Sequence, residues 1–312
     1  MSAMKRRAWL TVLSAAILSL FLIPLRSQAQ DVNQQLRDQY EGKTFLLRGF
    51  PAGDRLRYDS SGLLQNGASG DWTTDGFVQV SDIHLSDDRL VIKAQRMVAA
   101  WLPAKQFELR PLERGKGMNQ GKELVRVEIK ADTGMHNPSP EHVDAILSKI
   151  FLTPQDSLAD LVPEYWKACV SGGVQRAAAG CAFAPELLAI PGIEASGISY
   201  IPLAKGTSAE ASDPQSGSSR MPRGTRPPRT TYSPEPEFSE AARVAKYQGT
   251  VALSLMVDKD GVPTNVRITR AVGYGLDAKA VKAVESWTFA PAEKDGLPVP
   301  AQIVVEVNFH LY

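Results

Sequence analysis

The chain has 312 residues, of which 43% are hydrophobic and 22% are charged, a composition typical of globular proteins. Its 35 Lys and Arg residues nearly balance its 34 Asp and Glu residues, giving a net charge of +1. This balance argues against a protein that binds nucleic acid through its overall charge. At this length we expect two compact units joined by connecting segments.

Residues 1–29 have the layout of a secretory signal peptide. Lys5, Arg6 and Arg7 precede an apolar run over residues 8–25, and Ser27-Gln-Ala29 supplies a site for cleavage after Ala29. The alternative is an uncleaved anchor in the inner membrane, because the run is just long enough to span a bilayer. Both interpretations export the rest of the chain, so we expect a periplasmic protein, free or anchored. Cleavage would leave 31 basic against 34 acidic residues.

Residues 31–204 predict a first unit that begins as an antiparallel β-rich fold. A helical spacing of Val32, Leu36 and Tyr40 comes first. Short alternating segments bounded by turn residues then predict strands at residues 43–50, 56–59, 77–85, 89–95, 107–113 and 124–131. Such a series favours a small open barrel or a curved sheet. These residues resemble no family that we recognise.

The same unit is predicted to become helical after residue 138. Ser139 and Pro140 are typical of a helix start, and the apolar stripe consists of Val143, Ile146, Leu147 and Ile150. A second helix is expected to start at residues 153–154 and a third to run from residue 163 to Cys169. Cys169 and Cys181 are the only cysteines, and in an exported chain the pair predicts a disulfide bond.

Residues 205–232 have the composition of a linker. They are rich in Ser, Gly, Pro and Arg and contain almost no apolar residue. We expect a solvated tether between the first unit and residues 233–312.

Residues 233–312 predict a small domain with the order helix, strand, strand, helix, strand. Ser239 is placed to cap the first helix and Gly249 to end it. Residues 250–257 alternate as a half-buried strand, residues 258–261 form a turn, and residues 262–272 form the second arm of a hairpin. Residues 276–287 have helical spacing, and residues 302–311 alternate again. The fold class is therefore α+β, with a three-stranded antiparallel sheet and two helices in this domain.

The order and punctuation of this domain resemble the C-terminal domain of the TonB family of energy transducers, over residues 234–312. The resemblance rests on several spaced motifs, which are Pro-Glu-Phe-Ser-Glu-Ala-Ala-Arg at 236–243, Gly-Thr-Val at 249–251, Asp-Gly at 260–261, Val-Arg-Ile at 266–268, Ala283, Trp-Thr-Phe-Ala-Pro at 287–291 and Val-Val-Glu-Val-Asn-Phe at 304–309. Many family members have Tyr-Pro before the first helix, where this chain has Phe238-Ser239.

The resemblance implies a protein that binds a partner through an edge strand. In this family the TonB box of an outer-membrane receptor adds a strand beside the last strand of the sheet, which is β-augmentation. The receiving strand would consist of Gln302, Ile303, Val304, Val305, Glu306, Val307, Asn308, Phe309 and His310. An anchored form would also work with motor proteins of the ExbB and ExbD type, and the resemblance leaves a homodimer open. The anchor of typical members carries a histidine, whereas the first histidine here is His84.

No motif in the sequence predicts catalysis, a cofactor or a metal site. The Gly-rich stretch at residues 115–122 has the wrong spacing for a phosphate loop and predicts a hairpin loop instead. Residues 258–261 begin like a calcium loop, but the downstream ligands are missing. His136 and His142 are separated by two prolines and do not share a helical face. We therefore expect a non-enzymatic protein of the TonB type that supports energy-coupled transport. The competing hypothesis is a soluble periplasmic adaptor that uses the TonB-like module for assembly.

Overall fold

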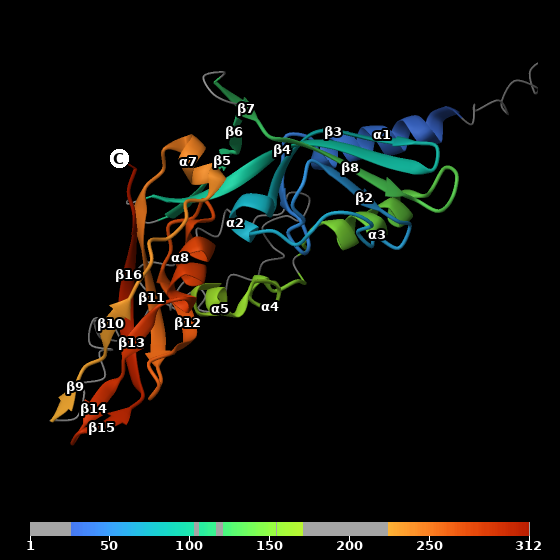
Figure 1. Ribbon diagram of the computed structural model, residues 1–312. Helices are drawn as coiled ribbons and strands as arrows, with labels where there is room; N and C mark the ends of the chain where they lie inside the picture. The colour runs from blue at the N-terminus through green and yellow to red at the C-terminus, as the bar shows by residue number, and fades with distance from the viewer. Residues whose placement is uncertain (1–25, 103–105, 117–120, 154, 171–223, 312) are drawn as a thin grey trace, which may run out of the picture.

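The computed structural model describes residues 26–102, 106–116, 121–153, 155–170 and 224–311 (Figure 1). Most of the predicted leader, residues 1–25, lies outside this part of the chain. The first described element is α1 (Arg26–Tyr40), which contains the predicted helical stripe. Across the described residues, no helix has both the length and the apolar character needed to span a membrane.

The first unit is built on an open six-stranded sheet with the order β1-β3-β4-β8-β2. Its strands are β1 (Thr44–Leu46), β2 (Arg55–Tyr58), β3 (Phe77–Ser86), β4 (Arg89–Leu102), β5 (Gln106–Pro111) and β8 (Arg126–Asp132). The far end of the long strand β4 pairs with β5. The predicted β-rich unit is confirmed, but β2 runs parallel to β8, so the sheet is not wholly antiparallel. Alternation shows which face of a strand is buried and carries no information on its direction.

Helices cover one face of this sheet. A core of apolar residues joins α1 and α3 (Pro140–Ile150) to β1, β2, β3, β4 and β8. Ser139 caps α3 by accepting a hydrogen bond from the backbone N–H of His142, and the predicted stripe of α3 is buried, as expected. The next helix does not start at residue 153, because Thr153 and Asp156 form a turn; α4 (Leu158–Leu161) begins after Ser157. α5 (Glu164–Val170) follows as predicted.

Two small elements complete the first unit. α2 (Trp72–Asp75) is a single turn capped by Asp71, whose carboxylate accepts a hydrogen bond from the backbone N–H of Thr73. β6 (Glu113–Gly115) and β7 (Lys122–Leu124) pair in antiparallel fashion, as expected for the two arms of the predicted hairpin, and residues 117–120 between them lie outside the described residues.

The C-terminal unit has the predicted order and the predicted sheet. α7 (Glu240–Ala245) is followed by β11 (Gly249–Val257), β12 (Pro263–Arg270), α8 (Leu276–Glu285) and β16 (Ala301–Phe309), and the antiparallel sheet has the order β12-β11-β16. Ser239 caps α7, as expected. The helix ends at Lys246 and not at Gly249, because Lys246 itself takes the left-handed conformation that terminates a helix.

Five short strands of the C-terminal unit were not predicted. They are β9 (Thr225–Arg226), β10 (Arg229–Tyr232), β13 (Thr288–Ala290), β14 (Ala292–Lys294) and β15 (Leu297–Val299). β10 pairs with β13, and β9 pairs with β14. Residues 225–232 therefore belong to a folded ribbon and not to the linker in which the sequence placed them. All four residues of β10 are exposed, so backbone pairing holds this strand without an apolar pattern. Residues 205–223 lie outside the described residues.

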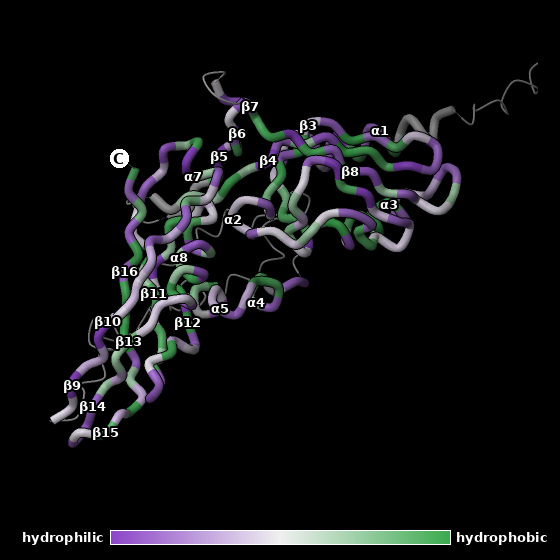
Figure 2. The backbone as a smooth tube through the Cα atoms, viewed as in Figure 1, coloured by the Kyte–Doolittle hydropathy of each residue, from purple (hydrophilic) through white to green (hydrophobic). Residues whose placement is uncertain are grey.

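The two units share one hydrophobic core. One continuous cluster contains residues of α2, β4 and α5 from the first unit and residues of β11, β12, α8 and β16 from the second. Trp72 and Trp166 meet edge to face in it, with ring centroids 5.1 Å apart. Hydrophobic residues follow β4 and β11 into this region, whereas the outlying loop ends are mainly hydrophilic (Figure 2). The first unit is thus packed against the C-terminal domain, and the two units are joined by more than a connecting segment.

Candidate functional site

The predicted receiving strand is β16, at one edge of the C-terminal sheet. It pairs with β11 over nine residues, from Gly249 opposite Phe309 to Val257 opposite Ala301. Within the described chain, β11 is its only strand neighbour. An edge strand of this length presents a row of backbone N–H and C=O groups to solvent, which is the physical requirement for strand addition.

The side chains of β16 alternate between the two faces of the sheet as the sequence predicts. Val307 and Phe309 are buried in the shared core, and Ile303 and Val305 are half-buried against it. The ring of Phe309 meets Phe238 edge to face at 5.4 Å, which ties the last strand to the residue before the α7 cap. Retention of an aromatic residue at position 238 therefore has a packing reason.

The outer face of β16 carries polar side chains that point back toward its own sheet. Gln302 donates to Ser254 at 2.9 Å, Arg270 donates to Glu306 at 2.8 Å, and Thr250 donates to Asn308 at 2.6 Å. Val304 stands between them and is 64% exposed. These contacts fix the neighbouring side chains on the β11 side and leave the opposite backbone edge open. His310 follows the strand and is exposed.

The other side of the sheet is covered. α5 lies against β12, on the side away from β16 (Figure 1). The sulfur of Cys169 in α5 lies 3.2 Å from the carbonyl oxygen of Ile268 in β12. Cys169 is buried and disulfide-bonded, and its predicted partner, Cys181, lies outside the described residues. Within the part of the chain that the structure describes, the first unit thus shields the sheet on the β12 side and leaves β16 accessible.

The turn between β11 and β12 has no calcium-loop character. The carboxylate of Asp258 accepts hydrogen bonds from the backbone N–H groups of Asp260 and Val262. Gly261 has a positive φ of 81°, and a Cβ there would lie 1.9 Å from the carbonyl oxygen of Phe289. The Asp-Gly pair of the motif is therefore explained by the turn and by the close approach of β13.

A second feature, which the sequence analysis missed, is the seam between the two units. Gly273 forms an antiparallel bridge with Ala100 of β4, and the backbone N–H of Tyr274 donates to the carbonyl oxygen of Ala99 at 2.9 Å. The N–H of Gly275 donates to the hydroxyl of Thr73 at 3.0 Å. A Cβ on Gly273 would lie 2.2 Å from the oxygen of Ala99. The Gly-Tyr-Gly sequence at residues 273–275 was the available signal.

A buried carboxylate holds this seam turn in place. Asp277 is 0% exposed and accepts hydrogen bonds from the N–H groups of Val272 and Gly273, at 2.8 and 2.7 Å. Burial raises the pKa of Asp277 to about 7, the two N–H donors oppose this shift, and the nearby Asp71 adds to it. Burial also raises the pKa of Asp71 itself.

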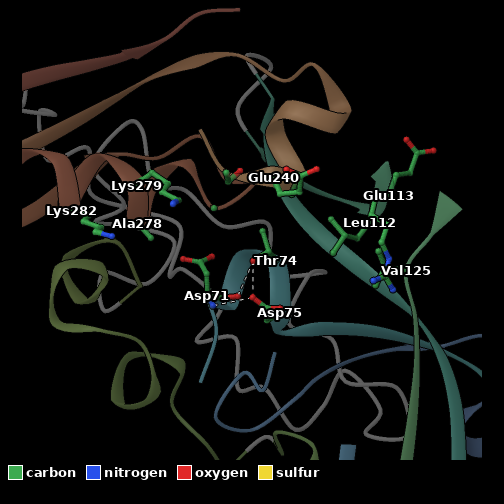
Figure 3. Close-up of a pocket in the computed structure, with 14 residues that line it drawn as sticks. Asp71, Thr74, Asp75, Leu112, Glu113, Val125, Glu240, Ala278, Lys279 and Lys282 are labelled. Carbon is green, nitrogen blue, oxygen red and sulfur yellow. Dashed lines mark hydrogen bonds between the residues drawn. The ribbon is translucent and has the colours of Figure 1, made fainter. Parts of the chain in front are cut away.

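A pocket of about 430 Å³ opens where the two units meet (Figure 3). Asp71, Thr74 and Asp75 come from the α2 turn, Lys279 and Lys282 come from α8, and Glu240 comes from α7. Several of these charges are already paired, since Lys279 contacts Glu237 at 2.9 Å and Glu240 pairs with Arg243. Charged side chains of both signs and small or apolar side chains line the pocket in equal measure, and this mixture points to no single ligand class.

The two histidines of the predicted helical region are held apart. His136 contacts Asp87 through Nδ1 at 2.7 Å, whereas Nε2 of His142 lies 2.8 Å from the carbonyl oxygen of Thr133. The described residues contain no group of three or more side chains placed to hold a metal ion.

Comparison with known proteins places the C-terminal unit. By its fold, the C-terminal unit is a small α+β domain with an edge strand that is open among the described residues. Residues 234–311 match the family of Gram-negative bacterial TonB protein C-terminal domains, so this part of the chain is a TonB-type C-terminal domain.

Two curated relatives match the same region. The chain is 32% identical over 81 residues to Protein tonB2 of Pseudomonas aeruginosa, which covers 26% of this chain and 30% of the relative. It is 30% identical over 78 residues to Protein TonB of Vibrio cholerae serotype O1, which covers 25% of this chain and 32% of the relative. The chain therefore spans about a third of the length of these relatives.

A solved structure was also found, the solution NMR structure of the Pseudomonas aeruginosa TonB C-terminal domain. The match covers 30% of this chain and 91% of the solved chain, with 16% sequence identity and a TM-score of 0.23. The family match suggests a location in the cell envelope, on its periplasmic side.

Proposed function

We propose that this chain is a TonB-type envelope protein whose C-terminal domain binds an extended segment of an outer-membrane receptor by strand addition at β16, in support of energy-coupled transport. The observation that carries the proposal is the asymmetry of the sheet. β12 is covered by α5, whereas β16 has a strand on one side only among the described elements. The family match, residues 234–311, supports the same role.

An added strand would find both backbone and side-chain partners at this edge. The outward N–H and C=O groups of β16 would supply hydrogen bonds. On the core face, a partner side chain would cover Ile303 and Val305, which are only half-buried now. Burying further apolar surface there is favourable by roughly 25 cal/mol per Å². The role is binding and force transmission, so it needs no catalytic group.

A pair of proline variants tests the edge. Consecutive N–H groups of a strand point to opposite sides, so only one of Val304→Pro and Val305→Pro removes an outward donor, and the other breaks a bond to β11. We expect the variant that keeps its far-UV circular dichroism spectrum to bind a TonB-box peptide at least about tenfold more weakly, a difference of about 1.4 kcal/mol. Fluorescence anisotropy with a labelled peptide measures the affinity.

A proline on the covered side provides the control. Thr264→Pro in β12 changes an exposed position of the opposite strand. It should leave peptide affinity unchanged if the variant remains folded. Two results would count against binding at the β16 edge. One is an equal loss of peptide affinity in the β12 variant and the β16 variants, and the other is unchanged affinity in both β16 variants when they remain folded.

The form in which the protein reaches the periplasm separates two versions of the proposal. An anchored chain would work with motor proteins of the ExbB and ExbD type, and a cleaved chain would act without them. Intact mass of the exported protein, together with its partition between membrane and soluble fractions, distinguishes the two. A mature chain starting at Gln30 in the soluble fraction favours the unanchored version.

The shared core favours a second candidate, an adaptor in which the first unit binds a ligand and the TonB-type domain mediates assembly. A unit that is packed against the binding domain moves with it, whereas a unit on a loose tether would not. Deleting the first unit is a poor test, because it would expose the apolar seam around Trp72 and Trp166. Substitutions on the open face of the first sheet leave the seam intact and are the sharper test.

A further inference from the structure

Among the described elements, helices cover only one face of the first sheet. Along β2, β4 and β8, buried side chains alternate with solvent-facing ones, and the buried set packs on α1 and α3. The solvent-facing set is polar or charged almost throughout. β2 lies at the edge of the sheet, but Gln65 and Asn66 cover its outer backbone edge by hydrogen bonding with Arg55 and Arg57. β8 and β2 are therefore reached from the open face of the sheet.

Positive charge concentrates on these two strands. The parallel register places Arg55 opposite Glu128 and Arg57 opposite Lys130, and Arg126 precedes Glu128 on the same face. We call these five residues the basic strip. The strip carries four cations and one anion. Asp132, the next residue of β8 on this face, pairs with Arg89 of β4, so the excess on the two strands is two positive charges in a chain whose overall net charge is +1.

The neighbouring strands do not share this excess. On β4, Lys93 pairs with Asp82 at 2.9 Å and Arg89 pairs with Asp132 at 3.1 Å. Beyond β2, the carboxylate of Asp59 is engaged by Ser61 and Gln65 of its own loop. The positive excess is therefore confined to a band two strands wide.

Three of the four cations form no ion pair within the described residues. Lys130 pairs with Glu128 at 2.8 Å. The guanidinium groups of Arg55, Arg57 and Arg126 are exposed and make no hydrogen bond or ion pair with another described residue. Arg55 also interacts electrostatically with the carboxylates of Asp54 and Glu128. Guanidinium groups bind carboxylate and phosphate oxygens through paired hydrogen bonds, which makes them suited to anionic ligands.

The shape of the strip selects among anionic partners. Neighbouring strands lie about 4.8 Å apart, and alternate residues on one strand lie about 6.6 Å apart, so the strip is a narrow line of charge. A flat membrane surface would also meet the neutralised pairs on β4. A nucleic acid strand is usually held with the help of aromatic side chains, and the strip contains none.

We propose that the basic strip binds a linear anionic glycan of the cell envelope. This inference does not depend on strand addition at β16, because the strip lies on the first unit and shares no residue with that edge. Such a contact would hold the protein beside an envelope polymer while β16 remains free for its partner.

Binding of the purified full chain to a labelled alginate oligosaccharide tests the proposal. Fluorescence polarisation should show binding that weakens with rising salt, as screening requires. The triple variant R55Q, R57Q and R126Q should bind at least about tenfold more weakly. The matched control K259Q, R267Q and K294Q removes the same charge from exposed positions of the C-terminal unit and should bind like the unaltered chain.

Several outcomes would overturn the proposal. Equal weakening in both triple variants would mean that only net charge matters. No binding of alginate, or equal binding of an uncharged dextran oligosaccharide, would exclude a charge-reading glycan site. Binding to anionic phospholipid vesicles or to single-stranded DNA in preference to alginate would assign the strip to another partner. Unchanged circular dichroism and unchanged TonB-box peptide affinity in both variants would show that the test concerns the strip alone.

Discussion

At the scale of single residues, the most consequential group is Asp277. It is fully buried, it holds the seam turn through two backbone N–H groups, and the groups facing it are acidic or neutral, namely Asp71 and Tyr165. Burial raises the pKa of Tyr165 to about 12, and the carboxylates of Asp71, Asp277 and Glu285 add to that shift. A carboxylate in this setting gains more from protonation in the folded state than in the unfolded chain.

The sign of the pH effect follows from that difference. The pKa of Asp277 rises from 3.8 to about 7 on folding, so the folded state binds the proton more tightly. The contribution of Asp277 to stability is therefore full below the unfolded pKa and is lost as pH rises through the folded value. We expect the free energy of unfolding to fall between pH 5 and pH 7, by up to about 1.4 kcal/mol per pH unit.

Asp277→Asn isolates this contribution. The amide has no charge to bury, so the slope between these pH values should be shallower in the variant. Urea unfolding at both pH values measures it. The pKa of His136 is raised by Asp87, so its titration also makes stability fall with rising pH. This contribution is the same in both proteins and cancels when their slopes are compared. Identical slopes in the variant and the unaltered chain would show that Asp277 does not titrate in this range.

At the scale of elements, local chemistry predicted most of the C-terminal domain. Alternation in β11 and β16, the cap at Ser239 and the helical spacing of α8 were sufficient to predict the order and the three-stranded sheet. β10 was missed because its residues are all exposed and only its backbone pairs. The parallel register of β2 was missed because periodicity does not report strand direction.

The candidate edge was predictable, whereas the seam was not. Apolar and polar residues alternate along β16, so the sequence alone indicates which face of the strand is buried. The seam depends on contacts between residues such as Thr73 and Gly275, which are 202 positions apart. No local pattern records such a contact, although the glycines at 273 and 275 indicate a special backbone conformation.

Ser239 links the element scale to the seam, and its removal is a specific test. Its hydroxyl accepts a hydrogen bond from the N–H of Ala242 and donates to the carbonyl oxygen of Tyr274. We expect Ser239→Ala to lower the free energy of unfolding by about 1–2 kcal/mol. The variant loses the helix cap, and both the N–H of Ala242 and the carbonyl oxygen of Tyr274 lose a hydrogen-bond partner. Ser239→Thr keeps the hydroxyl and should recover most of the loss. Urea unfolding midpoints check both values, and an alanine variant as stable as the threonine variant would refute this role.

At the scale of the whole molecule, the shared core changes how the protein is expected to unfold. α5 comes from the first unit, yet it packs on β12 of the second, and Trp166 is 0% exposed between them. A separate core in each unit would allow two independent transitions. One continuous cluster across both units favours a single cooperative transition under denaturant.

Trp166→Ala tests this coupling. Removal of a buried tryptophan from a core typically costs about 3–5 kcal/mol. Because the core is shared, the loss should appear in both units, as a common shift of the urea transition seen by far-UV circular dichroism and by peptide binding at β16. Leu297→Ala, at a position that is 68% exposed, is the matched control and should change stability by less than about 0.5 kcal/mol. A Trp166 variant that loses the structure of the first unit while β16 keeps its affinity and its transition midpoint would show that the two units fold independently, with the seam as a passive contact.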